Sequence, residues 1–97
     1  MPTFVTLSKF TDQGIRTIKD SPKRAQAFRD SAKKAGCTVQ ELLWTQGKYD
    51  VVSIIEAPDE TTVAALLLSV TKVGNISTQT LRAFTAAEME KILEKVV

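Results

Sequence analysis

Alternation of apolar and polar positions predicts strands in four segments of the chain. These segments are rich in β-branched and aromatic residues, and they cover Phe4–Phe10, Cys37–Gln46, Tyr49–Glu56 and Ile76–Phe84. The first segment has no face that looks solvent-like, which indicates a central strand. The third is also apolar on both faces, so both sides of the sheet need a cover. The fourth is mostly polar, which is typical of an edge strand.

Apolar residues spaced three and four apart predict two main helices. The first begins at Ser21, an expected N-cap that is followed by Pro22, and it stops before Gly36. The second begins after an expected N-cap at Asp59 and stops before Gly74. Its apolar stripe, which should pack on the sheet, consists of Val63, Leu66, Leu67, Val70 and Val73.

The elements follow one another as β-α-β-β-α-β, the ferredoxin-like order, within a single α+β domain of residues 1–97. A capping box at Thr85–Glu88 opens a short C-terminal helix. Two helices can cover one face of a four-stranded sheet, and no element remains to cover the other. We therefore expect a homodimer or a higher homo-oligomer, with the apolar flank Ala64, Ala65 and Leu68 as a second contact.

Two local expectations depend on the regularity of the pattern. Strict alternation in the second strand places Val39 and Leu43 on one face, with Leu42 and Trp44 on the other. The segment Thr11–Gly14, which follows the first strand, is expected to form a plain turn.

Composition excludes several function classes. The chain has no histidine, so it holds neither a Ser-His-Asp nor a Cys-His pair, and it offers no histidine ligand for zinc or haem. The acidic residues lack metal-cage spacing, and no phosphate loop or cofactor motif occurs. The net charge of +2 does not favour nucleic acid, and no apolar run of membrane-spanning length is present. The lone Cys37 and the lack of a secretory signal favour a cytoplasmic location.

The hairpin at Gly47 carries the first two candidate binding residues, Tyr49 and Asp50. A phenol and a carboxylate can provide hydrogen bonds at the mouth of a cavity. Because adjacent strand residues point to opposite faces, both can line one pocket only if a bulge intervenes. The alternative is structural, with Asp50 holding the hairpin and Tyr49 packing at the surface.

Arg82 and Gln13 complete the candidate set. Arg82 lies on a strand, where a guanidinium usually needs a carboxylate, and Asp50 or Glu56 is the expected partner. Binding of an anion is the functional alternative for Arg82. Gln13 follows the first strand and could hold a ligand through its amide.

Several short motifs together resemble the GYD-domain proteins. They are Thr11-x-Gln13-Gly14, Gly47-x-Tyr49-Asp50, Glu56-Ala57-Pro58-Asp59, Gly74-Asn75 and Thr80-Leu81-Arg82-Ala83-Phe84. The chain departs from the family's Gly-Tyr-Asp run because Lys48 separates the glycine from the tyrosine. The resemblance implies a dimeric α+β barrel, and it carries over no catalytic residue.

Two classes of function fit this pattern. The first is a non-enzymatic module whose oligomer binds a small molecule or a partner protein. The second is a cofactor-independent barrel enzyme of the oxygenase or isomerase type, acting on an apolar molecule with Tyr49, Asp50 or Arg82 as its polar groups. The absence of histidine favours the module, because such barrels often use histidine for proton transfer or iron.

Overall fold

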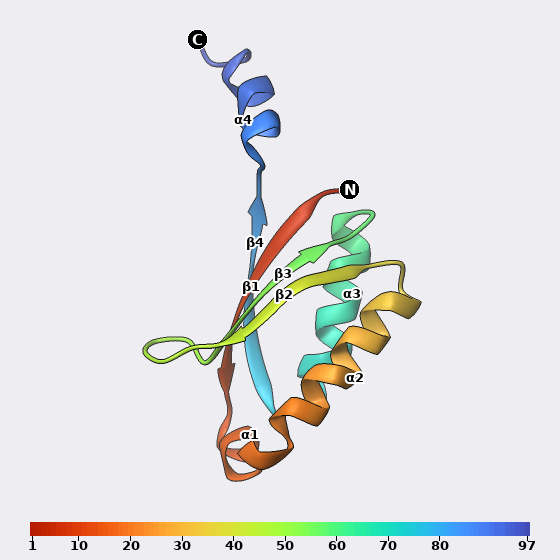
Figure 1. The fold of residues 1–97 in the computed structure, drawn as a ribbon, viewed down its shortest axis with the longest axis vertical. Coiled ribbons are helices and arrows are strands. Elements are labelled where there is room, and N and C mark those ends of the chain that lie inside the picture. The colour runs from red at the N-terminus through yellow and green to blue at the C-terminus, as the bar shows by residue number, and fades with distance from the viewer.

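The computed structural model describes residues 1–97 and shows the predicted order of elements with a C-terminal helix (Figure 1). The strands are β1 (Thr3–Phe10), β2 (Thr38–Trp44), β3 (Val51–Glu56) and β4 (Ile76–Ala83). The helices are α1 (Asp12–Arg16), the 3-10 helix η1 (Ile18–Asp20), α2 (Ser21–Lys34), α3 (Glu60–Thr71) and α4 (Ala86–Leu93). The ferredoxin-like α+β prediction is confirmed.

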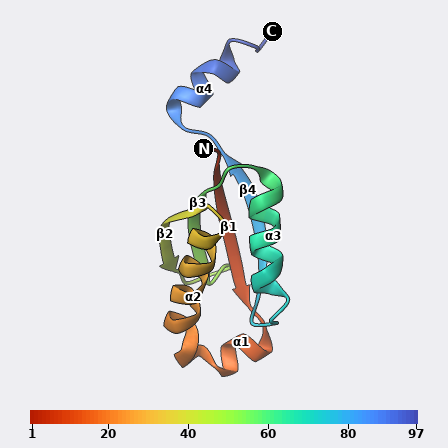
Figure 2. The ribbon, with the colours of Figure 1, turned by 90° about the vertical axis from the view of Figure 1, so that its right-hand side faces the viewer.

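The four strands form one antiparallel sheet in the order β2-β3-β1-β4. The prediction that β1 is central and β4 lies at an edge is therefore confirmed. The register places Phe4 opposite Ile55 on β3, and it places Thr6 opposite Ser53. These pairs share the face that α2 and α3 cover, and Figure 2 shows the two helices side by side over the sheet.

The core lies where the two helices meet the sheet near the start of β1. Phe4 and Ile55 come from the sheet, Ala32 from α2, and Val63 and Leu66 from α3. Each of these side chains is buried, and burial of one large apolar side chain stabilises the fold by roughly 1.5–3 kcal/mol. Cys37 belongs to this cluster too, as a small buried side chain.

A β-bulge in β2 overturns the predicted alternation. The register shifts between Val39 and Glu41, so one extra residue stands between two paired positions. Val39 is in the core and Leu42 packs against it, which places both on the helix side. Leu43 is exposed on the other face, so Val39 and Leu43 do not share a face as expected.

Two predicted element ends differ from the structure. Thr11–Gly14 is not a plain turn, because Thr11 caps the short helix α1 by accepting a hydrogen bond from the Gly14 amide at 3.1 Å. Ser21 is the first residue of α2 instead of its cap, since the preceding η1 leads directly into the helix. The predicted caps at Asp59 and Thr85 are both confirmed.

The face of the sheet opposite the helices is open. It carries Val5, Leu7, Val52 and Ile54 in its centre, as the register of β1 and β3 requires. Leu43 and Leu81 extend this apolar surface onto the edge strands, and both are exposed. We call this surface the open face.

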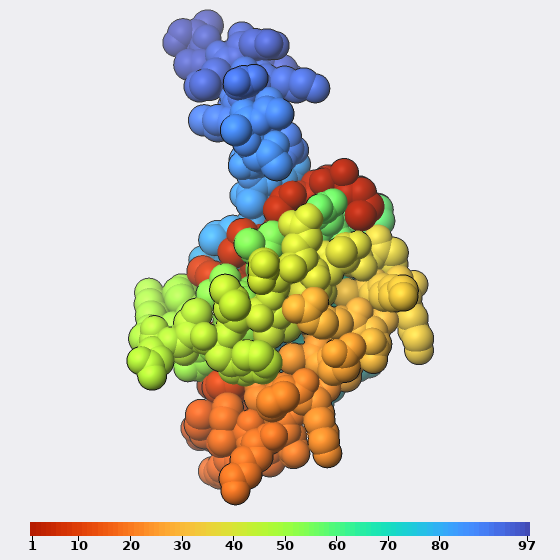
Figure 3. All heavy atoms as spheres, in the orientation of Figure 1, coloured from red at the N-terminus to blue at the C-terminus, as the bar shows by residue number.

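Helix α4 projects from the body of the molecule, beyond the end of β4 (Figures 1 and 3). Its position gives the chain a long axis of 50 Å against 31 and 19 Å for the other two. Met89 and Leu93 on α4 are exposed. None of the helices has both the length and the apolarity needed to cross a bilayer.

Replacement of Gly14 by alanine is expected to destabilise the fold by about 2 kcal/mol or more. Gly14 is buried, and an added Cβ would lie 2.0 Å from the Asn75 carbonyl oxygen. The same oxygen accepts the Thr11 amide at 3.0 Å, so α1 cannot move away without losing that bond. Urea unfolding measures the effect, with Arg16→Ala on the same helix as the control. Equal midpoints for the two variants would contradict this account.

Candidate functional site

A cavity of about 360 Å³ lies between α2, α3 and the sheet. It exists because side chains on the helix-facing side of the central strands become smaller along β1. Phe4 and Ile55 fill the core at one end, whereas Thr6, Ser8 and Ser53 follow at the next positions. Interiors pack at nearly crystalline density, so such a step from large to small side chains leaves space unless helix residues fill it. Among the α2 residues that line this space, Ala25 and Ala27 are small, and Phe28 is the one large apolar side chain.

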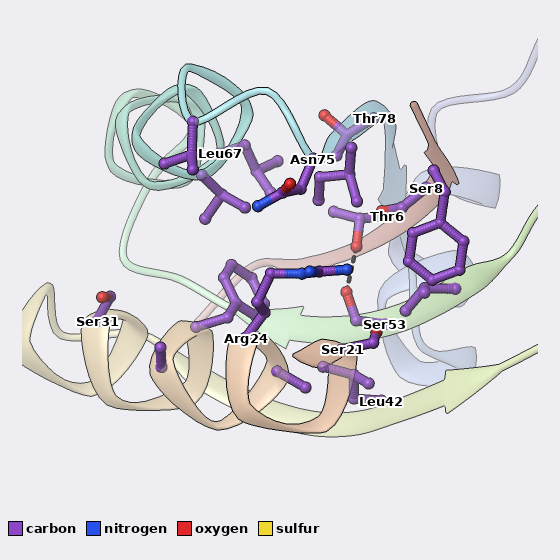
Figure 4. A pocket seen from close by; sticks show the side chains of 18 of the residues that line it. Thr6, Ser8, Ser21, Arg24, Ser31, Leu42, Ser53, Leu67, Asn75 and Thr78 are labelled. Atoms are coloured by element: carbon purple, nitrogen blue, oxygen red, sulfur yellow. Dashed lines mark hydrogen bonds between the residues drawn. The ribbon is translucent and has the colours of Figure 1, made fainter. Parts of the chain in front are cut away.

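Hydroxyl groups form the floor of this cavity. Thr6 and Ser53 are hydrogen-bonded to each other across β1 and β3, and Figure 4 shows the pair facing the helices. Thr6, Ser8 and Ser53 are all buried, and Thr78 on β4 stands next to Ser8 in the register. A floor of this kind offers donors and acceptors to a ligand without carrying charge.

The walls of the cavity are apolar. They come from α2, from α3 and the loop after it, and from all four strands, and they consist of Phe10, Phe28, Leu42, Trp44, Val51, Leu67, Val70, Val73 and Ile76. Apolar walls with a few convergent polar groups are typical of small-molecule sites, and a volume near 360 Å³ lies at the small end of their range.

Polar contacts organise the end of the cavity beside α1. Trp44 donates from its indole Nε1 to the Ser21 Oγ at 2.9 Å, which ties β2 to the start of α2. Arg24 donates to the carbonyl oxygens of Thr17 and Gly14 at 3.0 and 3.2 Å. Asn75, from the loop before β4, completes this end.

The predicted residues Tyr49 and Asp50 lie at the hairpin and not among the lining residues of the cavity. The Tyr49 hydroxyl donates to Gln79 Oε1 at 3.0 Å on the open face, and the ammonium groups of Lys9 and Lys48 lie within 6 Å of its ring centroid, at 5.9 and 5.8 Å. Asp50 Oδ2 accepts the Phe10 amide at 2.9 Å, which holds the hairpin against β1. The two side chains therefore have separate partners.

Arg82 lies at the base of α4, and its carboxylate partner is Glu88 instead of the expected Asp50 or Glu56. The Arg82 Nη2 to Glu88 Oε2 distance is 3.4 Å. The guanidinium also stands 4.5 Å from the Phe84 ring centroid and 5.6 Å from that of Phe4. The ion pair is partly exposed and contributes little by itself, but it links Arg82 on β4 to the capping-box carboxylate of α4.

Gln13 does not line the cavity but contacts two residues that do. Its Nε2 donates to the Val73 carbonyl at 3.1 Å and to Asn75 Oδ1 at 3.0 Å, and both partners line the cavity. Gln13 thus orients Asn75 from outside. A direct role for Tyr49, Asp50, Arg82 or Gln13 in ligand binding stays a prediction.

Cys37 and the acidic residues supply no further site. Burial, and after it the charge of Asp59, raises the pKa of the Cys37 thiol, so the reactive thiolate is disfavoured. Cys37 lies in the core and does not line the cavity. The structure contains no group of three or more His, Cys, Asp or Glu side chains placed to hold a metal ion.

The cavity could not be predicted from the pattern of apolar and polar positions, because it depends on the size of the side chains. Thr6, Ser8 and Ser53 occupy helix-facing strand positions where a fully packed core would carry larger apolar residues. A row of small hydroxyl residues on the covered face of a sheet is the sign that could have revealed it.

Comparison with known proteins agrees with the motifs in the sequence. The chain matches the GYD domain family over residues 4–93. It is 34% identical over 90 residues to the glutamine synthetase and cystathionine beta-lyase binding protein of Thermus thermophilus, and the match covers 92% of this chain and 95% of that protein. The chain therefore belongs to the GYD-domain family.

Solved structures show the same fold at lower identity. A feast or famine regulatory protein of M. tuberculosis, complexed with L-methionine, superposes with a TM-score of 0.67 at 13% identity. The superposition covers 89% of this chain and 52% of the regulator, so the chain spans about half of that protein's length. TTHA0845 from Thermus thermophilus superposes with a TM-score of 0.57 at 22% identity, over 89% of this chain and 96% of the other. These likenesses concern the fold alone.

Acidification is expected to unwind the first turn of α4. The hydrogen bond from the Thr85 amide, and after it the Arg82 guanidinium, holds the pKa of Glu88 below its ordinary value. A carboxyl group whose pKa is lowered on folding stabilises the fold in its ionised form. Its contribution is therefore complete above the ordinary pKa of about 4.3, and it is lost as the pH falls through the lowered value.

The Thr85 amide resonance, followed by NMR against pH, measures this titration. Glu88→Gln is the control, because glutamine can accept the same bond without a titrating charge. A Thr85 resonance that titrates at the pKa of an unfolded peptide would contradict the prediction.

Proposed function

We propose that this GYD-domain protein is a non-catalytic binding module that takes a small, mostly apolar molecule into the cavity between α2, α3 and the sheet. The observation that carries the proposal is the combination of about 360 Å³ of space, apolar walls and a hydroxyl floor. A ligand there would bury its apolar body against Phe28 and Leu67 and would direct a polar group at Thr6 and Ser53.

The chemistry of the lining favours binding over catalysis. The lining residues include no Asp, Glu, Lys, Cys or Tyr, and the chain has no histidine. The hydroxyls of Ser8, Ser21 and Ser53 therefore have no neighbouring base that could activate them as nucleophiles. An oxygenase or isomerase using this cavity would have to draw its acid–base groups from outside it.

The relative from Thermus thermophilus supports a binding role as well, since its name describes it as a binding protein for two enzymes. Binding of a partner protein is accordingly the second candidate function. The projecting helix α4, with Met89 and Leu93 exposed, is the observation that favours it.

For the open face we propose a second copy of the chain as the cover. Its apolar centre is rimmed by charges of opposite sign at the two ends of β1. Lys9 lies near the end of β1, while Glu56 stands opposite Thr3 at its start. Two copies that meet face to face with their strands reversed place each lysine end over a glutamate end. Tyr49, which lies between Lys9 and Lys48, would then face the partner copy.

Blocking the cavity is expected to abolish binding of small apolar molecules. The probes are n-hexanol, benzyl alcohol and hexanoate, each added to the protein while the amide resonances of Thr6 and Ser53 are followed by NMR. Ala27 lines the cavity from α2, so Ala27→Trp should weaken binding at least about tenfold by filling the space.

Gln26→Trp is the matched control, because Gln26 is the neighbouring exposed residue of the same helix and does not line the cavity. The probes should be recovered unchanged after incubation. Saturable shifts that survive in Ala27→Trp, or no saturable shift with any probe in the unmodified protein, would overturn the proposal.

Light scattering is expected to report a mass near twice 10.6 kDa at micromolar concentration. Leu43→Glu places a charge on the open face and should give monomers, since Leu43 is 56% exposed there in the single chain. Leu68→Glu, on the outer flank of α3, should leave the dimer intact and reduce only larger assemblies. Monomeric behaviour of the unmodified chain would instead leave the open face to another partner.

A further inference from the structure

The electrostatic character of the cavity comes from a single residue. Arg24 is the only charged side chain among the lining residues, and no carboxylate faces it there. Elsewhere the chain forms one ion pair, between Arg82 and Glu88, so Arg24 has no acidic partner. Desolvation of a guanidinium costs free energy unless the group has an ion-pair or hydrogen-bond partner.

Neutral oxygens hold the Arg24 guanidinium in place. Nη1 donates to the Thr17 carbonyl at 3.0 Å and to the Thr17 hydroxyl at 2.9 Å, while Nη2 donates to the Gly14 carbonyl at 3.2 Å. A guanidinium has five N–H donors, so these three bonds leave about two free. The contacts fix the orientation of the group and leave its positive charge uncompensated.

Arg24 and the hydroxyl floor line the same cavity. Figure 4 shows its side chain extending from α2 towards the strands that carry Thr6 and Ser53. Ser21 and Arg24 both belong to the first residues of α2, a helix of 14 residues, and both line the cavity. The positive end of the helix dipole therefore adds to the guanidinium charge on the same side.

We infer that the ligand of this cavity is a small apolar carboxylate, whose acid group binds to Arg24 while its hydrocarbon part lies along Phe28, Leu67 and Val70. The inference rests on the proposed function, since it names the class of molecule for the same cavity. An oriented guanidinium with two free donors can bind both oxygens of a carboxylate, a geometry that lysine cannot offer. The absence of any lining acid removes the repulsion that such a ligand would otherwise meet.

Three six-carbon probes that differ in their head group test this inference: hexanoate, n-hexanol and n-hexylammonium. Dissociation constants from NMR titration of the unmodified protein should rank hexanoate tightest, about tenfold or more below hexanol, with hexylammonium weakest. Hexanoate binding should also weaken as the pH falls through the pKa of the free acid, whereas hexanol binding should not change.

Arg24→Gln should bring hexanoate to the affinity of hexanol and leave hexanol itself unchanged. Arg29→Gln is the matched control, because Arg29 lies on the same helix, donates to the Val39 carbonyl at 2.9 Å and does not line the cavity. If Arg24 only braces α1, both probes will lose affinity together, and that result would overturn the inference. If Arg24→Gln does not fold, the ranking and pH dependence in the unmodified protein decide the question.

The outcomes separate the two proposals. Saturable hexanol binding in the cavity without a preference for hexanoate would refute the carboxylate and leave the binding module standing. Failure of all three probes to bind would refute both.

Discussion

The hydrogen-bonded pair of Thr6 and Ser53 at the centre of the sheet is the contact on which the interior depends. Two short hydroxyl side chains can be buried there because they form a hydrogen bond with each other. Neither hydroxyl therefore needs water as its partner. The helices rest on the larger side chains at the start of β1, such as Phe4 and Ile55. The cavity above Thr6 and Ser53 therefore results from the small side chains of the sheet at these positions.

The opposite face of the sheet is also apolar. An antiparallel sheet usually has one solvated face, yet here Val5, Leu7, Val52 and Ile54 line the face that carries no helix. One face thus borders a small space with a polar floor, and the other presents an apolar surface of the kind that marks an interface. The proposed ligand site and the proposed contact between copies therefore lie on opposite faces of the same four strands.

Much of the fold could be predicted because its signals are local. Asp59 accepts the Thr62 amide as a cap must, and Gly36 has a φ of +80° where α2 stops. The bulge after Val39 could not be predicted, since the extra residue shows only when β2 is paired with β3. The cavity was missed for a related reason, because Thr6 and Ser53 are 47 residues apart and meet only in the folded sheet. Arg82 was correctly expected to need a carboxylate, but Glu88 on the following helix is closer than any partner across the sheet.

The bulge in β2 affects which edge of the sheet can accept a strand from another chain. Both outer strands expose unpaired amides and carbonyls, which can recruit a strand from another chain. A bulge distorts this row of donors and acceptors on β2, whereas β4 runs for eight residues without proline or bulge. The edge of β4 is therefore the more regular template for the addition of a strand. Two β4 edges that pair with each other occupy both templates, so a contact of this kind forms a closed pair.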